Sequence, residues 1–190
     1  MEFCDRSLEK VLQNANETKR PIQMALIKQY MRQTFIGLQA MHAKNISHRD
    51  LKPENILLVS KNGQEEIKIC DLGAAKVLTS VCGKDGPLNT PYVVSRYYRA
   101  PELIMGSNKY DCSIDIWSVG CMLFELITRT PLFPGEAEGL QILEQSMILG
   151  TPEDHEVRKL DEMVVKPVMA LLKRFKDNGK VDMASLLEKA

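Results

Sequence analysis

Four side chains of the sequence could together carry out phosphoryl transfer, and three of them lie in one short segment, residues 48–55 (HRDLKPEN). The carboxylate of Asp50 can accept the proton of an attacking hydroxyl, and the ammonium group of Lys52 can offset charge on the transferring phosphoryl group. The amide of Asn55 and, farther along, the carboxylate of Asp71 offer Mg²⁺ the oxygen ligands that it prefers. Since this reaction needs positioned charges rather than covalent help from the protein, these four are the candidate catalytic residues.

Two short strands are predicted to bring Asn55 and Asp71 side by side. Residues 56–59 (ILLV) and 67–70 (IKIC) are rich in apolar residues, and Asn62-Gly63 between them is a strong turn signal. Antiparallel pairing places the residue before the first strand next to the residue after the second. We therefore expect Asn55 and Asp71 to hold one metal ion between them.

Helices are predicted for most of the remaining chain. Apolar residues recur at helical spacing over about residues 6–13, and again from Pro21 to a turn at Lys44-Asn45. Residues 113–128 are apolar nearly all round, which indicates a helix buried in the middle of a domain. A further amphipathic helix covers 138–149, the segment 153–190 is mostly helical, and residues 74–100 form a long surface loop. The fold class is mainly α with a small β-hairpin.

Composition restricts the class of protein. The 190 residues suit one domain, and 25 Lys+Arg against 25 Asp+Glu give no net charge with which to attract nucleic acid. The five cysteines are odd in number and form no C-x-x-C pair, which indicates reduced thiols rather than disulfides or a zinc site. No apolar run is long enough to cross a membrane, and no signal-peptide pattern is present. We expect a soluble cytoplasmic or nuclear protein with neither nucleic acid nor membrane as a partner.

Several motifs resemble those of one enzyme family. Residues 48–55 match H-R-D-L-x-x-x-N, residues 71–73 read DLG, residues 100–102 read APE, and residues 115–120 (DIWSVG) match D-x-W-S-x-G. On these motifs the chain resembles the C-terminal lobe of a eukaryotic protein kinase over nearly all of residues 1–150. The resemblance implies ATP and Mg²⁺ as cofactors and the Ser/Thr hydroxyls of proteins as substrates. It also implies that Asp115 hydrogen-bonds the backbone of the catalytic loop, and we expect His48 to pack beneath that loop.

Further motifs indicate which group within the protein kinase family the chain resembles. Residues 92–99, 132–135 (LFPG) and 149–152 (LGTP) resemble the group of cyclin-dependent, mitogen-activated and glycogen synthase kinases. Residues 71–76 (DLGAAK) and the 136–149 helix favour the glycogen synthase kinases, whereas residues 90–92 (TPY) resemble the dual-phosphorylation motif of mitogen-activated kinases. We favour the glycogen synthase kinase branch and leave the other open.

The resemblance implies regulation by phosphorylation, with an upstream activating kinase as a possible partner. Two arginines close to Tyr92 are suited to capture a phosphate on it, although Thr90 is an alternative site. The resemblance assigns Lys76 to a phosphate already present on the substrate and Ser95 to a bridge between the catalytic Asp and Lys. The regulatory candidates are Arg49, Lys76, Thr90, Tyr92, Ser95, Arg96 and Arg99.

The resemblance also implies a map of the domain. Residues 1–5 resemble the hinge, 48–55 the catalytic loop, 71–102 the activation segment and 113–128 the central buried helix. The backbone near Glu2 and Cys4 would meet adenine, with Leu57 and Cys70 below it. The full set expected to contact nucleotide is Glu2, Cys4, Lys52, Asn55, Leu57, Cys70 and Asp71.

The sequence departs from the family at both ends. It holds no G-x-G-x-x-G, and its only V-A-I-K-like run, residues 25–28 (ALIK), falls in a predicted helix. We therefore expect a truncated lobe without the N-lobe and the last helices, in which Glu102 has no arginine partner and the isolated chain is inactive. The alternative is a binding or scaffold module without catalysis. A metal-dependent hydrolase that uses Asp50 and Asp71 is a third possibility, but it leaves the APE and D-x-W motifs unexplained.

Overall fold

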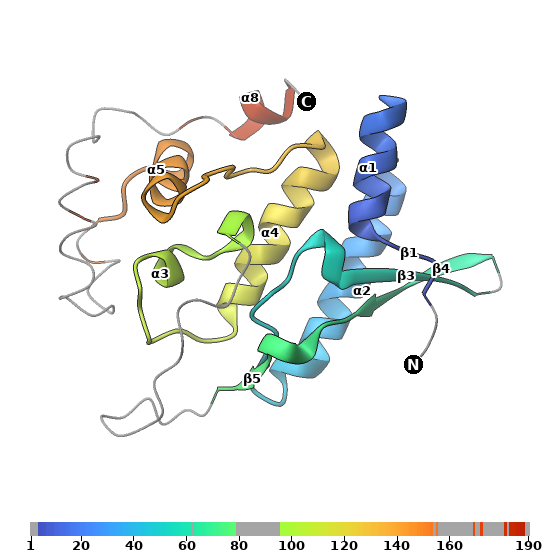
Figure 1. Cartoon of the computed structure of the whole chain (residues 1–190), viewed down its shortest axis with the longest axis horizontal. Coiled ribbons are helices and arrows are strands. Elements are labelled where there is room, and N and C mark those ends of the chain that lie inside the picture. The colour runs from blue at the N-terminus through green and yellow to red at the C-terminus, as the bar shows by residue number, and fades with distance from the viewer. Residues whose placement is uncertain are drawn as a thin grey trace.

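Two long helices, α2 (Met24–His42) and α4 (Ser113–Thr128), form the centre of the molecule (Figure 1). The computed structural model describes residues 4–61, 63–78, 96–153, 155, 169, 172, 181 and 183–188. The predictions of a helix after Pro21 and of a buried helix over 113–128 are confirmed. The main core lies around these helices and includes Tyr30, Leu38, Ile114, Met122 and Leu126.

The first helix, α1 (Leu8–Thr18), is longer than the sequence pattern indicated. It starts at Ser7, whose hydroxyl accepts a hydrogen bond from the amide of Lys10 at 3.3 Å. The predicted end near residue 13 is wrong because Ala15 is buried at helical spacing after Leu12 and carries the apolar face one turn farther. The helix ends at Lys19, which adopts a left-handed conformation with φ 55°.

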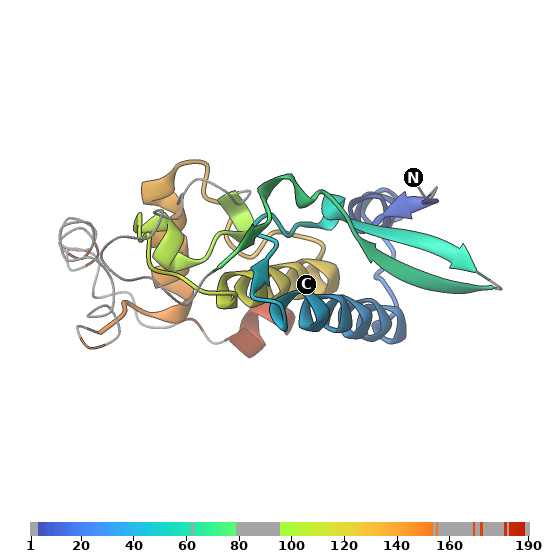
Figure 2. The same cartoon turned by 90° about the horizontal axis from the view of Figure 1, so that it is seen from below.

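The predicted hairpin is confirmed as β3 (Ile56–Lys61) and β4 (Gln64–Ile69). The strands pair antiparallel with Ile56 opposite Ile69, and the short strand β1 (Arg6–Ser7) pairs with the other edge of β3. Figure 2 shows the hairpin projecting beyond the helices at one end of the molecule. Because the projecting part is the turn, the opposite end of the hairpin is the one that meets the rest of the fold.

Glu65 fastens the hairpin to helix α2. Its carboxylate accepts from the Tyr30 hydroxyl and from Arg6, both at 2.5 Å, and its backbone carbonyl accepts from the side-chain amides of Gln29 and Gln33 at 3.0 Å. These contacts attach the hairpin to α2 at a point far from the candidate catalytic side chains. The hairpin is therefore held as a rigid element where it reaches the site.

A second, two-stranded sheet was not predicted. Strand β2 (Ile46–Ser47) pairs antiparallel with β5 (Lys76–Val77), with Ser47 opposite Lys76. The amide of Leu78 extends the pairing with a 2.7 Å hydrogen bond to the carbonyl of Asn45. This sheet holds the chain just before residue 48 against the chain just after Asp71.

The remaining elements pack on the other side of α4 (Figure 1). They are the 3₁₀ turn η3 (Arg96–Tyr98) and the helices α3 (Pro101–Ile104), α5 (Glu138–Leu149) and α8 (Met183–Glu188). The helix predicted over 138–149 is confirmed. Across the described residues, helices predominate and the sheets are small, as the sequence predicted.

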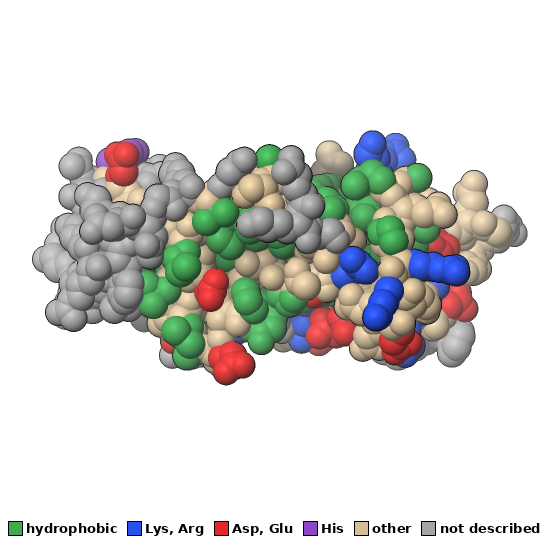
Figure 3. Space-filling view, turned by 90° about the horizontal axis from the view of Figure 1, so that it is seen from above, with side chains coloured by type: hydrophobic (Ala, Val, Ile, Leu, Met, Phe, Trp, Pro, Cys, Tyr) green, Lys and Arg blue, Asp and Glu red, His purple; other side chains and the backbone are tan. Residues whose placement is uncertain are grey.

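The surface of the described part carries scattered apolar side chains between charged groups (Figure 3). The outer face of α5 contributes Leu140, Met147 and Leu149, whereas Gln141, Ile142 and Gln145 of the same helix are buried. Within the described ranges, no helix combines the length and the apolar character needed to cross a bilayer.

A buried acid and phenol join α4 to η3. The hydroxyl of Tyr98 donates to Oε2 of Glu125 at 2.7 Å, and Glu125 is only 7% exposed. Burial raises the pKa of Glu125 to about 6; the hydrogen bond from Tyr98 opposes this shift, and the nearby carboxylates of Glu9 and Glu54 add to it. The ionised form of Glu125 is therefore disfavoured in the folded chain.

Glu125→Gln is expected to make the free energy of unfolding less dependent on pH. Because the folded pKa of about 6 lies above the ordinary 4.5, this group stabilises the fold fully only below pH 4.5. The stabilisation is lost as the pH rises through about 6 and amounts to roughly 2 kcal/mol at most. Urea unfolding at pH 4.5 and pH 7 measures the change, with exposed Glu17→Gln as the control. Equal pH dependence in the Glu125→Gln chain and the parent chain would contradict the expectation.

Candidate catalytic site

The carboxylate of Asp115 fixes the start of the HRD loop, the name used here for residues 48–55. This carboxylate is 1% exposed and lies in the first turn of α4. Its Oδ2 accepts from the His48 amide at 2.9 Å and from the Ser47 hydroxyl at 3.0 Å, and its Oδ1 accepts from the Arg49 amide at 2.9 Å. The side chain of His42 adds a fourth hydrogen bond at 2.8 Å. The expected bond from Asp115 to the loop backbone is therefore present.

The imidazole of His48 lies beneath the loop, fully buried, as expected. Its Nδ1 accepts a hydrogen bond from the Asp50 amide at 3.3 Å, so its Nε2 carries the proton and donates to the carbonyl of Cys70 at 2.8 Å. His48 thus connects the HRD loop to the end of strand β4. Both of its ring nitrogens are engaged in hydrogen bonds within the protein.

The structure brings the three candidate side chains of the HRD loop into direct contact. The ammonium group of Lys52 lies 3.0 Å from Oδ2 of Asp50. The amide nitrogen of Asn55 donates to the carbonyl of Asp50 at 2.8 Å and to its Oδ2 at 3.3 Å. Asn55 is only 6% exposed. Since its nitrogen is engaged, the side-chain oxygen of Asn55 is the atom that can accept a cation.

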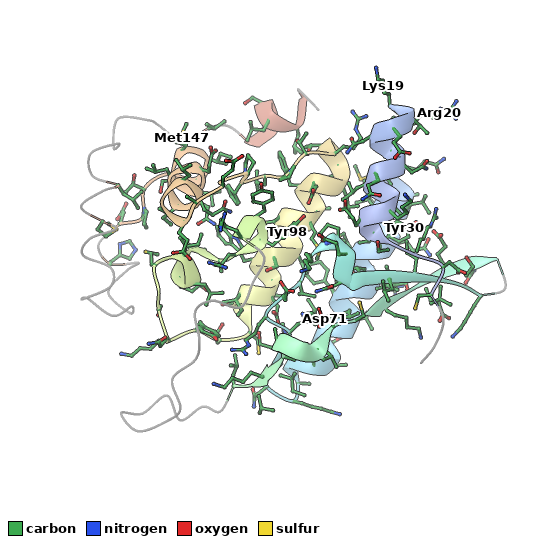
Figure 4. The ribbon with its side chains drawn as sticks, in the orientation of Figure 1. Lys19, Arg20, Tyr30, Asp71, Tyr98 and Met147 are labelled. Atoms are coloured by element: carbon green, nitrogen blue, oxygen red, sulfur yellow. The ribbon has the colours of Figure 1, made fainter. Side chains whose placement is uncertain are left out.

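Asp71 directly follows Cys70, the residue that pairs with Asn55 at the end of the hairpin. The amide of Cys70 donates to the carbonyl of Asn55 at 2.9 Å, which continues the β3–β4 pairing and places Asp71 one residue beyond that contact. Figure 4 shows Asp71 at the end of the hairpin opposite its turn. Asp71 has a left-handed backbone with φ 63°, and Oδ1 of its exposed side chain accepts from the Gly73 amide at 3.3 Å.

Gly73 leaves room for that carboxylate. A Cβ atom on Gly73 would lie 3.2 Å from Oδ1 of Asp71, so a larger residue there would push the carboxylate aside by a few tenths of an ångström. The chain continues as η2 (Leu72–Ala74), with Asp71 as its capping residue.

Arg49 links the HRD loop to two other segments. Its backbone is left-handed with φ 67°, and the residue is 9% exposed. Its Nε donates to the carbonyl of Ala74 at 2.6 Å, and its Nη1 donates to the hydroxyl of Tyr110 at 2.9 Å. The family resemblance made Arg49 a regulatory candidate, but nothing in the sequence pointed to Tyr110, because its contact with Arg49 depends on the fold.

The other candidates are distributed as follows. Cys4 precedes β1, Leu57 lies in β3 opposite Ser7, and Cys70 follows the last residue of β4, so these three expected nucleotide contacts lie in or beside the same three-stranded sheet. Burial raises the pKa of the Cys70 thiol, and both Asp71 and Cys4 add to the shift. Four further candidates fall outside the described residues: Glu2, Thr90, Tyr92 and Ser95.

The two arginines expected to capture phosphate contact the region of α5 instead. Arg99 is 8% exposed, and its Nη1 lies 2.8 Å from Oε1 of Glu138. Arg96 donates to the carbonyl of Glu136. Lys76 lies in β5 and is partly buried. Phosphate capture by Arg96 and Arg99 stays a prediction, and an incoming phosphate would have to compete with Glu138.

A cavity of about 590 Å³ adjoins α3, α4 and α5, and Tyr110 is one of its lining residues. Glu102 lines it; burial raises the pKa of this carboxyl, and Asp111 adds to the shift. No cation pairs with Glu102 among the described residues. The indole nitrogen of Trp117 and Oε1 of Gln145, which also line the cavity, have no hydrogen-bond partner within that part of the chain.

The metal site expected at Asn55 and Asp71 differs from a site in which protein side chains supply every ligand of the ion. In the described ranges no three His, Cys, Asp or Glu side chains are grouped so that they could hold an ion. An amide oxygen and one carboxylate suit Mg²⁺ when phosphate oxygens and water complete its shell. The donor set therefore fits a magnesium nucleotide better than a permanently bound metal.

Comparison with known proteins gives a consistent result. The sequence matches the family described as "Protein kinase domain" over residues 1–188. It is 40% identical over 161 residues to Protein kinase gsk3 of Schizosaccharomyces pombe, which covers 85% of this chain and 40% of that protein. It is 36% identical over 196 residues to Glycogen synthase kinase 1 of Pyricularia oryzae, which covers 98% of this chain and 48% of that protein. The chain thus spans less than half the length of these relatives.

Proposed function

The chain belongs to the protein kinase domain family, near kinases of the glycogen synthase kinase type, and we propose that it transfers the γ-phosphoryl group of ATP to Ser/Thr hydroxyls of proteins. One observation carries the proposal. Lys52 and Asn55 both contact Asp50, on a loop whose backbone is fixed by a buried carboxylate. Such preorganisation is what phosphoryl transfer requires of a protein.

Each side chain has a distinct proposed task. Asp50 accepts the proton of the substrate hydroxyl and orients that oxygen toward the phosphoryl group. Lys52, held 3.0 Å from Asp50, offsets the negative charge that develops on the transferring group. Asn55 and Asp71 are the residues that would hold Mg²⁺, which when bound neutralises charge on the phosphate oxygens. Leu57 and Cys70 would lie beneath the adenine.

We further propose that these residues correspond to the C-terminal lobe of a kinase, with the glycogen synthase kinase branch favoured over the mitogen-activated branch. The activation segment would be residues 71–102, regulated by phosphate on Tyr92 or Thr90. Arg49 would tie the order of this segment to catalysis, and Lys76 would help to bind a phosphate already present on the substrate. The odd number of cysteines and the absence of a C-x-x-C pair support a cytoplasmic or nuclear location.

A second candidate function is a binding module without catalysis. One observation favours it: the 190 residues contain no G-x-G-x-x-G to cover the phosphates of ATP. The four candidate catalytic residues are nevertheless all present, which a binding module would not require. We therefore expect the 190 residues to transfer phosphate only when a nucleotide-covering segment is supplied.

The test is a chimaera in which this chain replaces the segment that it matches in the Schizosaccharomyces pombe kinase. We expect the chimaera to transfer labelled phosphate from ATP to serine or threonine of a protein substrate. Asp71→Asn is expected to slow the transfer about 100-fold and to weaken binding of Mn²⁺ with ADP about tenfold, because the variant loses a charged metal ligand. Electron paramagnetic resonance of Mn²⁺ measures the binding.

Glu66→Gln is the matched control, because it removes an exposed carboxylate from the same hairpin. This control should leave both transfer and Mn²⁺ binding unchanged. A chimaera that melts cooperatively and binds nucleotide but transfers no phosphate would reject the kinase proposal and favour the binding module.

A further inference from the structure

Arg49 is a nearly buried cation whose side chain joins three segments that are distant in the sequence. Its amide is held by Asp115 of α4, its Nε donates to Ala74 and its Nη1 donates to Tyr110. The two side-chain acceptors are neutral oxygens, a carbonyl and a phenol. A hydrogen bond donated by a guanidinium is charge-assisted and fixes the planar group in one orientation.

The hydroxyl of Tyr110 is presented from a rigid support. Its ring packs against the main core, and the turn that carries it leads directly into α4. The neighbouring Asp111 accepts a hydrogen bond from the amide of Ser113 at 2.8 Å, which fixes the start of that helix. Because core and helix hold the ring, the phenol oxygen is a fixed point toward which the Arg49 guanidinium can be oriented.

The orientation of Arg49 in turn affects the turn that carries Asp71. Ala74, whose carbonyl accepts from Nε, is the last residue of η2, and Asp71 caps the start of η2. A displaced guanidinium would therefore release one end of a three-residue turn whose other end is the proposed metal ligand. The same arginine precedes Asp50, so both sides of the proposed reaction centre depend on it.

We propose that Tyr110 is a positioning residue for phosphoryl transfer, since its hydroxyl orients Arg49 so that η2 is held against the HRD loop. The inference rests on the proposed function. It concerns the hydroxyl alone, because phenylalanine would fill the same space in the core. Tyr110 does not contact the reacting groups, and its effect is transmitted through Arg49 and Ala74.

Tyr110→Phe in the chimaera is expected to lower kcat about tenfold and to change KM for the protein substrate less than about twofold. In an Arg49→Lys background, which lacks the Nε donor, the same substitution should have no further effect. A structural role alone would instead give additive losses. Unchanged kcat, or full additivity of the two substitutions, would overturn the proposal.

Hydrogen exchange in the 190-residue chain supplies a readout that does not need activity. The amide of Ala75 donates to the carbonyl of Leu72 at 3.0 Å and so reports on η2. Its exchange should be about tenfold faster in Tyr110→Phe, because the turn opens more often. Tyr30→Phe, which also loses a side-chain hydroxyl contact but far from η2, should leave it unchanged.

The two readouts separate failure of this inference from failure of the proposed function. A parent chimaera that transfers no phosphate would reject the proposed function. The hydrogen-exchange rate of the Ala75 amide would still show whether the Tyr110 hydroxyl stabilises η2. Arg49→Lys is measured in parallel and should also speed hydrogen exchange at the Ala75 amide. This second variant tests the connection from Arg49 to η2 even if Tyr110→Phe fails to fold. If the Ala75 amide exchanges in the folded variants at the same rate as in the parent chain, the proposed role of Tyr110 is rejected.

Discussion

Asp115→Ala is expected to destabilise the folded chain by about 3–5 kcal/mol, because it leaves several buried donors without an acceptor. The carboxylate accepts from two backbone amides, of His48 and Arg49, and from the side chains of Ser47 and His42. At 1% exposure, water cannot replace it without opening the start of α4. Folded domains are stable by only about 5–15 kcal/mol, so the loss is a large fraction of the whole.

Urea unfolding followed by the fluorescence of the single tryptophan measures this loss. Trp117 lies two residues from Asp115 on α4 and stacks on Phe133 with ring centres 5.8 Å apart, so it reports on the same region. Asp111→Ala is the matched control: it removes an exposed carboxylate that accepts from the Ser113 amide, and should cost about 1 kcal/mol. Equal losses in the two variants would show that Asp115 is not the anchor of the HRD loop.

The parts of the fold that could be predicted are those in which local signals agree. Asn62-Gly63 between two apolar runs indicated the hairpin, and the hairpin alone required residues 55 and 71 to become neighbours. The unbroken apolar character of 113–128 identified α4 because only a central helix is buried on most of its faces. Motif spacing identified Asp50, Lys52 and Asn55, and the contacts among them follow from their presence on one tight loop.

The parts that could not be predicted depend on contacts between distant segments. Strands β1, β2 and β5 have two residues each, which is too short for any alternating pattern, and they exist only because a partner strand lies beside them. The charge of Arg99 suggested a phosphate ligand, but its partner Glu138 is brought close only when α5 packs against η3. Tyr110 was missed for the same reason, since a tyrosine before a helix carries no signal of its own.

Asp50→Asn is expected to slow phosphoryl transfer by the chimaera about 10²–10⁴-fold, the range associated with loss of a general base. The amide has the shape of the carboxylate but cannot take the proton of the substrate hydroxyl. It also removes the negative charge that pairs with Lys52 at 3.0 Å, while the amide oxygen that remains can still accept the hydrogen bond from Asn55. The loss should fall on kcat, because Asp50 acts in the transition state more than in nucleotide binding.

Rapid-quench measurement of a single turnover with labelled ATP separates this effect from binding and product release. Asp5→Asn is the matched control, since its exposed carboxylate accepts from the amide of Ser60 at 2.7 Å and is not one of the candidate catalytic groups. Urea unfolding should show that Asp50→Asn changes stability by less than about 1 kcal/mol, because an ion pair in contact with solvent contributes little. A variant that keeps more than about a tenth of the parent rate would show that proton transfer does not limit the step, and the base would have to be sought elsewhere.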